Sequence, residues 1–164
     1  MIAGYADSLP VTPAVALDRF VNACLTEFTA VDALPGSLEL LEALPADRFA
    51  VVTSGTRVIA EARMRGAGLP APAFMIAAGD VTQGKPHPMP YLAAAERLGL
   101  DPSECLVVED APAGLAAGLA AGCRTLALLT THGREDLDGA DLYAKDLSAV
   151  EVTVTSTGLR VSAA

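Results

Sequence analysis

Two adjacent carboxylates, Glu109 and Asp110, directly follow the apolar run Leu106–Val108. A short, continuously apolar run is typical of a strand that is buried on both faces of a parallel sheet. Acidic residues are first tolerated at the carboxyl end of such a strand, where open α/β sheets bind their ligands. Two neighbouring carboxylates repel each other, and a hard cation such as Mg²⁺ relieves that repulsion. An alternative interpretation is that the pair caps the next helix, because Asp110 precedes Pro112 near the expected first turn.

Polar side chains also follow two earlier apolar runs: Thr53 and Ser54 follow the first, and Lys85 lies in the loop after the second. In a parallel sheet with right-handed crossovers, the carboxyl ends of these strands meet at one edge, beside the acid pair. Hydroxyl and amide donors, a cation and a metal-binding acid pair suit a phosphoryl group, whose transfer is catalysed mainly by positioning and charge neutralisation. Taken singly, Thr53 and Ser54 also fit an ordinary turn, and Lys85 a solvated loop. Their order along the chain favours a shared site.

The elements that would position these residues alternate between helix and strand. We expect helices over about 12–28, 37–44 (with Ser37 as its cap), 57–66, 89–98 and 113–121, and strands over 49–52, 74–77, 106–108 and 125–129. This alternation predicts the α/β class, with a Rossmann-like parallel sheet covered by helices on both faces. Residues 151–155 and 159–162 alternate in polarity around Ser156-Thr157-Gly158, which predicts a C-terminal β-hairpin at an outer edge of the sheet.

Composition and charge restrict the partners. The chain has 164 residues, 52% of them hydrophobic, which suits one domain with a sizeable core. Its net charge of −9 argues against nucleic acid or an anionic membrane as a partner. No apolar run approaches the roughly 20 residues of a membrane span. Three widely spaced cysteines, Cys24, Cys105 and Cys123, predict free, buried thiols in a reducing cytoplasm.

The chain resembles the haloacid dehalogenase superfamily of phosphohydrolases, in particular the group that contains sugar-phosphate and polyol-phosphate phosphatases and β-phosphoglucomutase. The resemblance runs from about Pro35 to Leu147. It is carried by Val-Val-Thr-Ser-Gly at 51–55, Gly-Lys-Pro-His-Pro at 84–88 and Val-Val-Glu-Asp-Ala-Pro-Ala-Gly at 107–114.

The resemblance implies a role for each residue of the candidate site. Thr53 would bind the transferring phosphoryl group, helped by the backbone of Ser54. Lys85 would neutralise charge on the nucleophile and on the phosphate. Asp110 would bind Mg²⁺, with Glu109 binding it directly or through water. The implied substrate is a small phosphorylated metabolite, a sugar or polyol phosphate.

One family motif is absent from the 164 residues. The family's nucleophile is the first Asp of an Asp-x-Asp-Gly-Thr motif, and no acids before Thr53 form Asp-x-Asp after an apolar strand. The resemblance therefore predicts a phosphatase form without its front third, either because the reading frame begins too late or because a shortened natural product exists. On this basis we expect a helical cap remnant over 1–34, an α/β core over 35–150 and the hairpin or tail over 151–164.

The absent motif also predicts an unusual sheet. In the family, the strand that ends in the nucleophile lies between the strand ending at Thr53 and the strand ending at Asp110. Without it, these two strands either leave a gap or pair directly.

Other functional classes fit the sequence less well. The segment 79–85 nearly matches a nucleotide-binding phosphate loop, but Pro86 replaces the hydroxyl that would bind Mg²⁺. A phosphorelay receiver domain has its acids first and its lysine last, which is the reverse of the order here. The serious alternative is a non-catalytic relic that binds phosphate and Mg²⁺ in a regulatory or interaction role.

Overall fold

The computed structural model describes residues 31–156 and 158–164. The helix expected over 12–28, and with it nearly all of the expected cap remnant, lies outside the described residues. The chain begins its described part with a short loop that leads into the first helix. No helix in the described ranges is long and apolar enough to cross a membrane.

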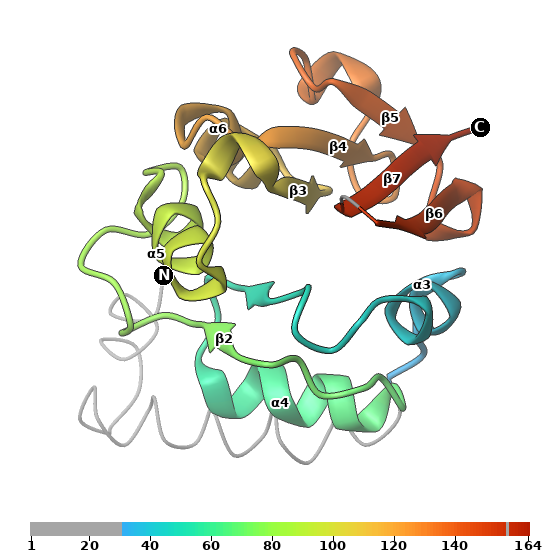
Figure 1. Ribbon diagram of the computed structural model, residues 1–164. Coiled ribbons are helices and arrows are strands. Elements are labelled where there is room, and N and C mark those ends of the chain that lie inside the picture. Colours follow the sequence, from blue (N-terminus) through green and yellow to red (C-terminus); the bar gives the residue numbers. More distant parts are fainter. Residues whose placement is uncertain (1–30, 157) are drawn as a thin grey trace, which may run out of the picture.

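Helices and strands alternate along the described chain (Figure 1). The α-helices are α3 (Ser37–Ala43), α4 (Arg57–Gly66), α5 (Met89–Leu98) and α6 (Pro112–Ala120), with short 3₁₀ helices η1 (Pro102–Glu104), η2 (Arg134–Asp136) and η3 (Leu147–Ala149). The strands are β1 (Val51–Val52), β2 (Met75–Ile76), β3 (Leu106–Glu109), β4 (Arg124–Leu128), β5 (Leu142–Ala144), β6 (Val150–Thr155) and β7 (Gly158–Ala163). The expected α/β class with parallel sheets is confirmed.

The parallel strands form two separate sheets. One contains β1 and β2, and the other has the order β3-β4-β5. Val51 is in register with Met75 in the first sheet, and Leu106 with Arg124 in the second. Within residues 31–156 and 158–164, no strand pairing joins β1 to β3. The absence of the family motif predicted either a gap between β1 and β3 or direct pairing of the two strands. Direct pairing does not occur in the described ranges.

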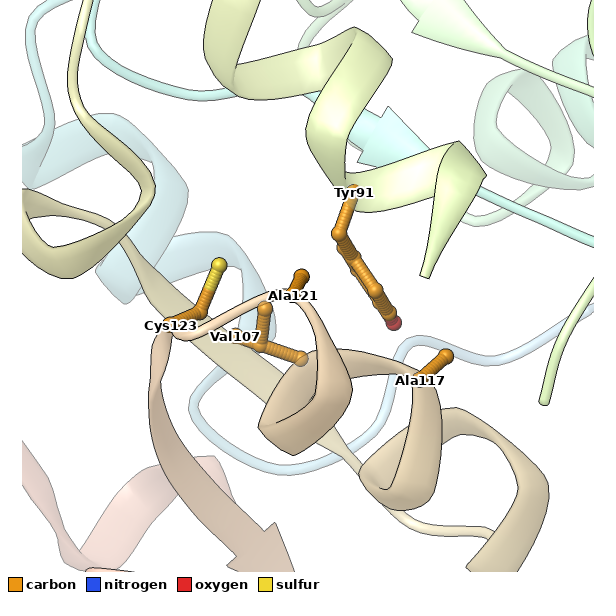
Figure 2. Close-up of a cluster of buried hydrophobic side chains, with 5 residues drawn as sticks. All are labelled: Tyr91, Val107, Ala117, Ala121 and Cys123. Carbon is orange, nitrogen blue, oxygen red and sulfur yellow. The ribbon is translucent and has the colours of Figure 1, made fainter. Parts of the chain in front are cut away.

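Helix α6 covers one face of β3 and β4. Ala117 and Ala121 pack with Val107 of β3 and Tyr91 of α5, and Leu115 packs with Ala127 of β4 and Leu137. Figure 2 shows the first of these clusters, in which the tyrosine ring reaches from α5 towards α6. The small residues of α6 allow this close approach, because adding a Cβ to Gly118 would place it 2.9 Å from Val107 Cγ1.

The C-terminal hairpin packs on the β3-β4-β5 sheet without joining it. Strands β6 and β7 pair in antiparallel register, with Val152 opposite Val161, as a two-stranded sheet of their own. Val150 and Ala163 pack against a buried cluster that contains Leu126 and Leu128 of β4. The hairpin is thus confirmed, but the expectation that it extends an outer edge was wrong: β6 and β7 pair only with each other, and Val150 and Ala163 pack on apolar side chains of the sheet instead.

Two local expectations also needed correction. Strand β5 was not predicted, because its three residues are too short for a recognisable pattern; it pairs with β4 through Leu126 and Leu142. Ser37 does not cap α3: the helix begins at this residue, and Gly36 is the N-cap with a left-handed φ of 80°. A Cβ on Gly36 would lie 2.2 Å from the backbone nitrogen of Ser148, so only glycine fits between α3 and η3.

Candidate functional site

Lys85 connects the two parallel sheets. Its Nζ donates a hydrogen bond to the carbonyl oxygen of Val52 at 3.0 Å and forms an ion pair with Glu109 Oε1. Each of the two charged side chains is only 11% exposed. Lys85 is therefore a buried, paired lysine and not a solvated loop residue. The contact brings the end of β1, where Thr53 follows Val52, to the end of β3.

Tyr91 shares Glu109 with Lys85, and the sequence analysis did not identify it. The Tyr91 hydroxyl donates to the same Oε1 atom that pairs with the lysine. The Lys85 ammonium also lies over the tyrosine ring, 5.0 Å from its centroid. Burial and the neighbouring Glu109 charge raise the pKa of Tyr91 above its usual value, so the phenol remains a donor. An aromatic residue soon after the lysine loop was the available signal, but it is equally typical of a helix core position.

Gly114 leaves room for the Glu109 carboxylate at the start of α6. A Cβ on this glycine would lie 2.1 Å from both Cδ and Oε2 of Glu109. Both carboxylate oxygens lie against the first turn of the helix, with Oε1 2.5 Å from the same Cβ position, and Oε1 also receives two donors. The partial positive charge of a helix N-terminus stabilises an anion at this position.

Asp110 has a separate set of partners. Thr131 Oγ1 lies 3.0 Å from Asp110 Oδ2 and 2.9 Å from the Asp110 carbonyl oxygen. Nδ1 of His132 lies 2.9 Å from the same carbonyl oxygen. Asp110 does not cap α6, because the N-cap is Ala111 and no side chain caps that end. The capping alternative for this residue is therefore wrong.

Thr131 and His132 were also not identified from the sequence. They follow β4 by a few residues, at the same carboxyl edge of the sheet as Asp110. The rule that polar residues after apolar strands gather at one edge would have found them. The apolar run that precedes them, in β4, is the longest of the parallel strands.

Thr53 and Ser54 lie in the turn from β1 to α4. The Thr53 amide donates to Ile76 O at 2.9 Å, which continues the pairing of β1 with β2, and its Oγ1 accepts from the Gly55 amide at 3.0 Å. The Thr53 side chain therefore stabilises the turn, as the turn interpretation predicts, and its proposed contact with phosphate stays a prediction. Ser54 is exposed.

A second ion pair braces the loops around Thr53 and Lys85. Arg57, in the first turn of α4, donates to Asp80 Oδ2 at 2.5 Å and to Met75 O at 3.0 Å. The same Asp80 oxygen accepts from the Ala77 amide at 2.8 Å, and this bond lowers the pKa of Asp80 below its usual value. Asp80 is thus held ionised where β2 ends, in the segment that leads to Lys85.

The site can supply Mg²⁺ with only a few oxygen ligands from the protein. Within the described ranges, no group of three or more His, Cys, Asp and Glu side chains is placed to hold a metal ion. Mg²⁺, however, commonly binds one or two carboxylates and completes its octahedron with water and substrate phosphate. Asp110 fits this requirement, since its carboxylate is half-buried and has a single hydroxyl partner. Glu109 offers hard oxygens next to it, but Lys85 and Tyr91 already donate to one of them.

Comparisons with known proteins identify the family. The family model "haloacid dehalogenase-like hydrolase" matches residues 4–122. "Hexitol phosphatase A" of Escherichia coli is 44% identical over 135 residues, which are 81% of this chain and 62% of that protein. "Glycerol-1-phosphate phosphohydrolase 2" of Saccharomyces cerevisiae is 44% identical over 131 residues, 73% of this chain and 52% of that protein. The chain thus spans little more than half the length of these two relatives.

Solved structures show the same fold. A haloacid dehalogenase family hydrolase from Deinococcus radiodurans, with bound phosphate and sodium, has a TM-score of 0.66 and 34% identity, and the match covers 87% of this chain and 66% of that one. CbbY from Rhodobacter sphaeroides, in complex with xylulose-1,5-bisphosphate, has a TM-score of 0.78 at 24% identity, and the match covers 90% of this chain and 72% of that one. The first of these matches supports the family assignment, and the second supports the fold. From the matched residues and the shared fold together, the chain belongs to the haloacid dehalogenase-like hydrolases.

Proposed function

We propose that this site binds the phosphoryl group of a small phosphorylated metabolite, a sugar or polyol phosphate. The observation that carries the proposal is the position of Lys85, which is fixed between the ends of β1 and β3 by Val52 and by the Glu109 carboxylate. A cation held at the carboxyl edge of parallel strands is suited to neutralise a phosphate. The names of two relatives, a hexitol phosphatase and a glycerol-1-phosphate phosphohydrolase, support the substrate class.

Each site residue has a role in this proposal. The Thr53 hydroxyl and the Ser54 amide donate to phosphoryl oxygens, and Lys85 neutralises their charge. Asp110 holds Mg²⁺, and Glu109 contacts the ion directly or through a water molecule. When bound, Mg²⁺ polarises the phosphoryl oxygens and offsets the negative charge that develops on them.

We propose further that the 164 residues alone bind phosphate without hydrolysing phosphate esters. The reason is the absence of an Asp-x-Asp pair after an apolar strand, since removing a nucleophile commonly costs about a million-fold in turnover. The second candidate function is a non-catalytic protein that binds phosphate and Mg²⁺ in a regulatory or interaction role, for which the fixed Lys85 and the Asp110 carboxylate would suffice. We expect it to act in the cytoplasm, where Cys105 and Cys123 remain free thiols.

Binding is tested by titration with inorganic phosphate and with Mg²⁺, followed through backbone amide NMR signals. Phosphate should shift signals near Thr53 and Lys85, and Mg²⁺ should shift signals near Asp110. Lys85→Ala should remove the first response and Asp110→Asn the second. The exposed residues Lys145 and Asp138 provide matched controls, because Lys145→Ala and Asp138→Asn keep the same charge changes outside the site. Equal responses in the wild-type chain and in the site variants would refute the proposed site.

Turnover tests whether the 164 residues are catalytic on their own. The chain should show no Mg²⁺-dependent hydrolysis of p-nitrophenyl phosphate or of sugar phosphates above background. Robust hydrolysis that Lys85→Ala abolishes would mean that another carboxylate acts as the nucleophile. The chain would then be a phosphatase in its own right, and the non-catalytic alternative would be excluded.

A further inference from the structure

We propose that Tyr91 is a positioning residue, which holds the Glu109 carboxylate and, through it, the Lys85 ammonium in the orientation that binds phosphate. This inference rests on the proposed phosphate-binding function of the site. It concerns a residue of α5 that none of the three motif segments contains.

The Tyr91 ring is fixed by packing. Tyr91 is 7% exposed and packs with Val107, Ala117, Ala121 and Cys123. Figure 2 shows the ring extending from α5 into the space beside α6, with the hydroxyl oxygen at its far end. A buried aromatic ring among close-packed neighbours has few alternative rotamers. Its hydroxyl therefore occupies a defined position.

Strand β3 places Glu109 next to the Tyr91 hydroxyl. Val107 packs against the tyrosine ring, and Glu109 lies two residues further along the same strand. Alternate residues of a strand point to the same face, so Glu109 follows Val107 towards α5 and α6. Gly114 then allows the carboxylate to lie against the first turn of α6.

One carboxylate oxygen receives both donors. The Tyr91 hydroxyl and the Lys85 ammonium both donate to Glu109 Oε1. Because the Glu109 side chain is only 11% exposed, water cannot readily replace a lost donor. A tyrosine that served only the apolar core would require no carboxylate at this position. The phenol instead fixes the Glu109 oxygen to which Lys85 is anchored, while the second lysine bond goes to Val52.

The variant Tyr91→Phe removes this donor and retains the ring. We expect it to weaken the binding of inorganic phosphate by about five- to tenfold, the size expected for the net contribution of one ordinary hydrogen bond. The matched control is Tyr143→Phe. The Tyr143 hydroxyl donates to Leu137 O at 2.9 Å and accepts from the Ala140 amide at 3.2 Å, so its loss should lower the melting temperature and leave phosphate affinity unchanged.

A double-mutant cycle shows whether Tyr91 acts through Glu109. Glu109→Met provides an apolar side chain of similar length that cannot accept the phenol hydrogen bond. In this background, adding Tyr91→Phe should change phosphate affinity by less than about twofold. An undiminished effect of Tyr91→Phe would show that the phenol acts by another route and would overturn the inference.

A second measurement does not depend on phosphate binding. The ammonium protons of Lys85 should exchange slowly with water in the wild-type chain and give an observable ¹⁵N-correlated NMR signal, because they are buried and hydrogen-bonded. Tyr91→Phe should broaden or remove this signal, whereas Tyr143→Phe should preserve it. If the wild-type chain binds no phosphate, the proposed function fails, and the lysine signal still decides the positioning role. An absent wild-type signal, or one that Tyr91→Phe leaves unchanged, overturns the inference.

Failure of Tyr91→Phe to fold would not prevent the test. The hydroxyl proton of Tyr91 in the wild-type chain should be protected from exchange and should lose this protection in Glu109→Ala. Protection that survives in Glu109→Ala would show that the phenol is not bonded to Glu109, and the inference would be wrong.

Discussion

Glu109 and Asp110 are adjacent in the chain but have different partners. Glu109 is paired with Lys85 and Tyr91, whereas Asp110 is contacted by Thr131 and His132. The two carboxylates are thus suited to different tasks. Glu109 fixes the lysine that would meet a phosphate, so Asp110 is the main proposed Mg²⁺ ligand and Glu109 would assist it directly or through water.

At the residue scale, we predict that Thr131→Val weakens Mg²⁺ binding. The Thr131 hydroxyl orients the Asp110 carboxylate, and its loss should lower Mg²⁺ affinity by about three- to tenfold, as for the loss of one hydrogen bond. Thr131→Ser keeps the hydroxyl and should restore most of the affinity. NMR titration with Mg²⁺ measures the affinity of both variants. Thr130→Val, at the exposed neighbouring position, is the control. Equal affinity in Thr131→Val and the wild-type chain would contradict the prediction.

At the scale of the elements, the approach of α6 to β3 depends on small residues. Gly118 and Gly114 are both buried on the helix face that meets the sheet. Alanine would normally be preferred over glycine within a helix by about 1 kcal/mol. The glycines therefore reflect a packing requirement that overrides helix propensity.

The variant Gly118→Ala should be destabilising despite the higher helix propensity of alanine. Its Cβ would lie 2.9 Å from Val107 Cγ1, and overpacking of this kind typically costs about 1–3 kcal/mol of unfolding free energy. Denaturant unfolding measures the change. Gly84→Ala is the control, since a Cβ there meets no atom within 4 Å. Adding Val107→Ala should relieve the overlap, so that the double variant loses less stability than the sum of the two single variants. Strict additivity would argue against the contact.

Asp141 connects β4 to the residues just before β5. Its Oδ2 accepts from the Thr125 amide at 2.8 Å and lies 3.1 Å from Thr125 Oγ1, and its Oδ1 pairs with Arg124 at 3.0 Å. The backbone hydrogen bond from Thr125 is the largest cause of a pKa lowered below the usual 3.8, although burial acts in the opposite direction. The ionised form of this carboxyl therefore stabilises the contact between the two strands.

This lowered pKa predicts a loss of stability in acid. Because the pKa is lower in the folded chain than in the unfolded chain, the stabilisation is complete above the unfolded pKa of about 3.9. It is lost as the pH falls through the lower folded value. Asp141→Asn should be less stable than the wild-type chain at pH 6, and the difference should shrink in strong acid. Unfolding free energies measured across this pH range provide the test. A difference that stays constant with pH would exclude this role of the charge.

At the scale of the whole molecule, two parallel sheets meet without strand pairing between them in the described ranges. Lys85 crosses from one to the other through Val52 and Glu109. Strands β1 and β3 have no further partner within residues 31–156 and 158–164, and Val108 of β3 is 39% exposed. Unpaired strand edges with apolar side chains favour association between chains.

We therefore predict marginal stability and a tendency to associate. The apparent melting temperature should change with protein concentration, and sedimentation should show oligomers at higher concentration. Val108→Lys places a charge beside the open edge and should reduce both effects. The exposed Val58 on α4 is the control position, because Val58→Lys introduces the same charge away from the edge. A cooperative melt that does not change with concentration would refute this prediction.

The sequence alone predicted most of the elements and the gathering of charged residues at one edge. Apolar runs and their helical or strand periods are local, and the polar residues after Val52, Ala77 and Val108 could be placed at strand ends without knowing any distance. The same reasoning anticipated that Lys85 and Glu109 would lie close together, which they do. The proposed roles of Thr53, Ser54 and Asp110 remain predictions.

Only the tertiary structure decided which partner each charged group has. Tyr91 meets Glu109 because α5 packs on the face of β3 that carries Val107, and Thr131 meets Asp110 because β4 lies in register beside β3. The hairpin lies on the sheet because Val150 and Ala163 pack against Leu126 and Leu128 of β4. These contacts join residues far apart in the chain, and they depend on packing between elements. Local patterns carry no information about that packing, because they record only which face of an element is apolar and not what covers it.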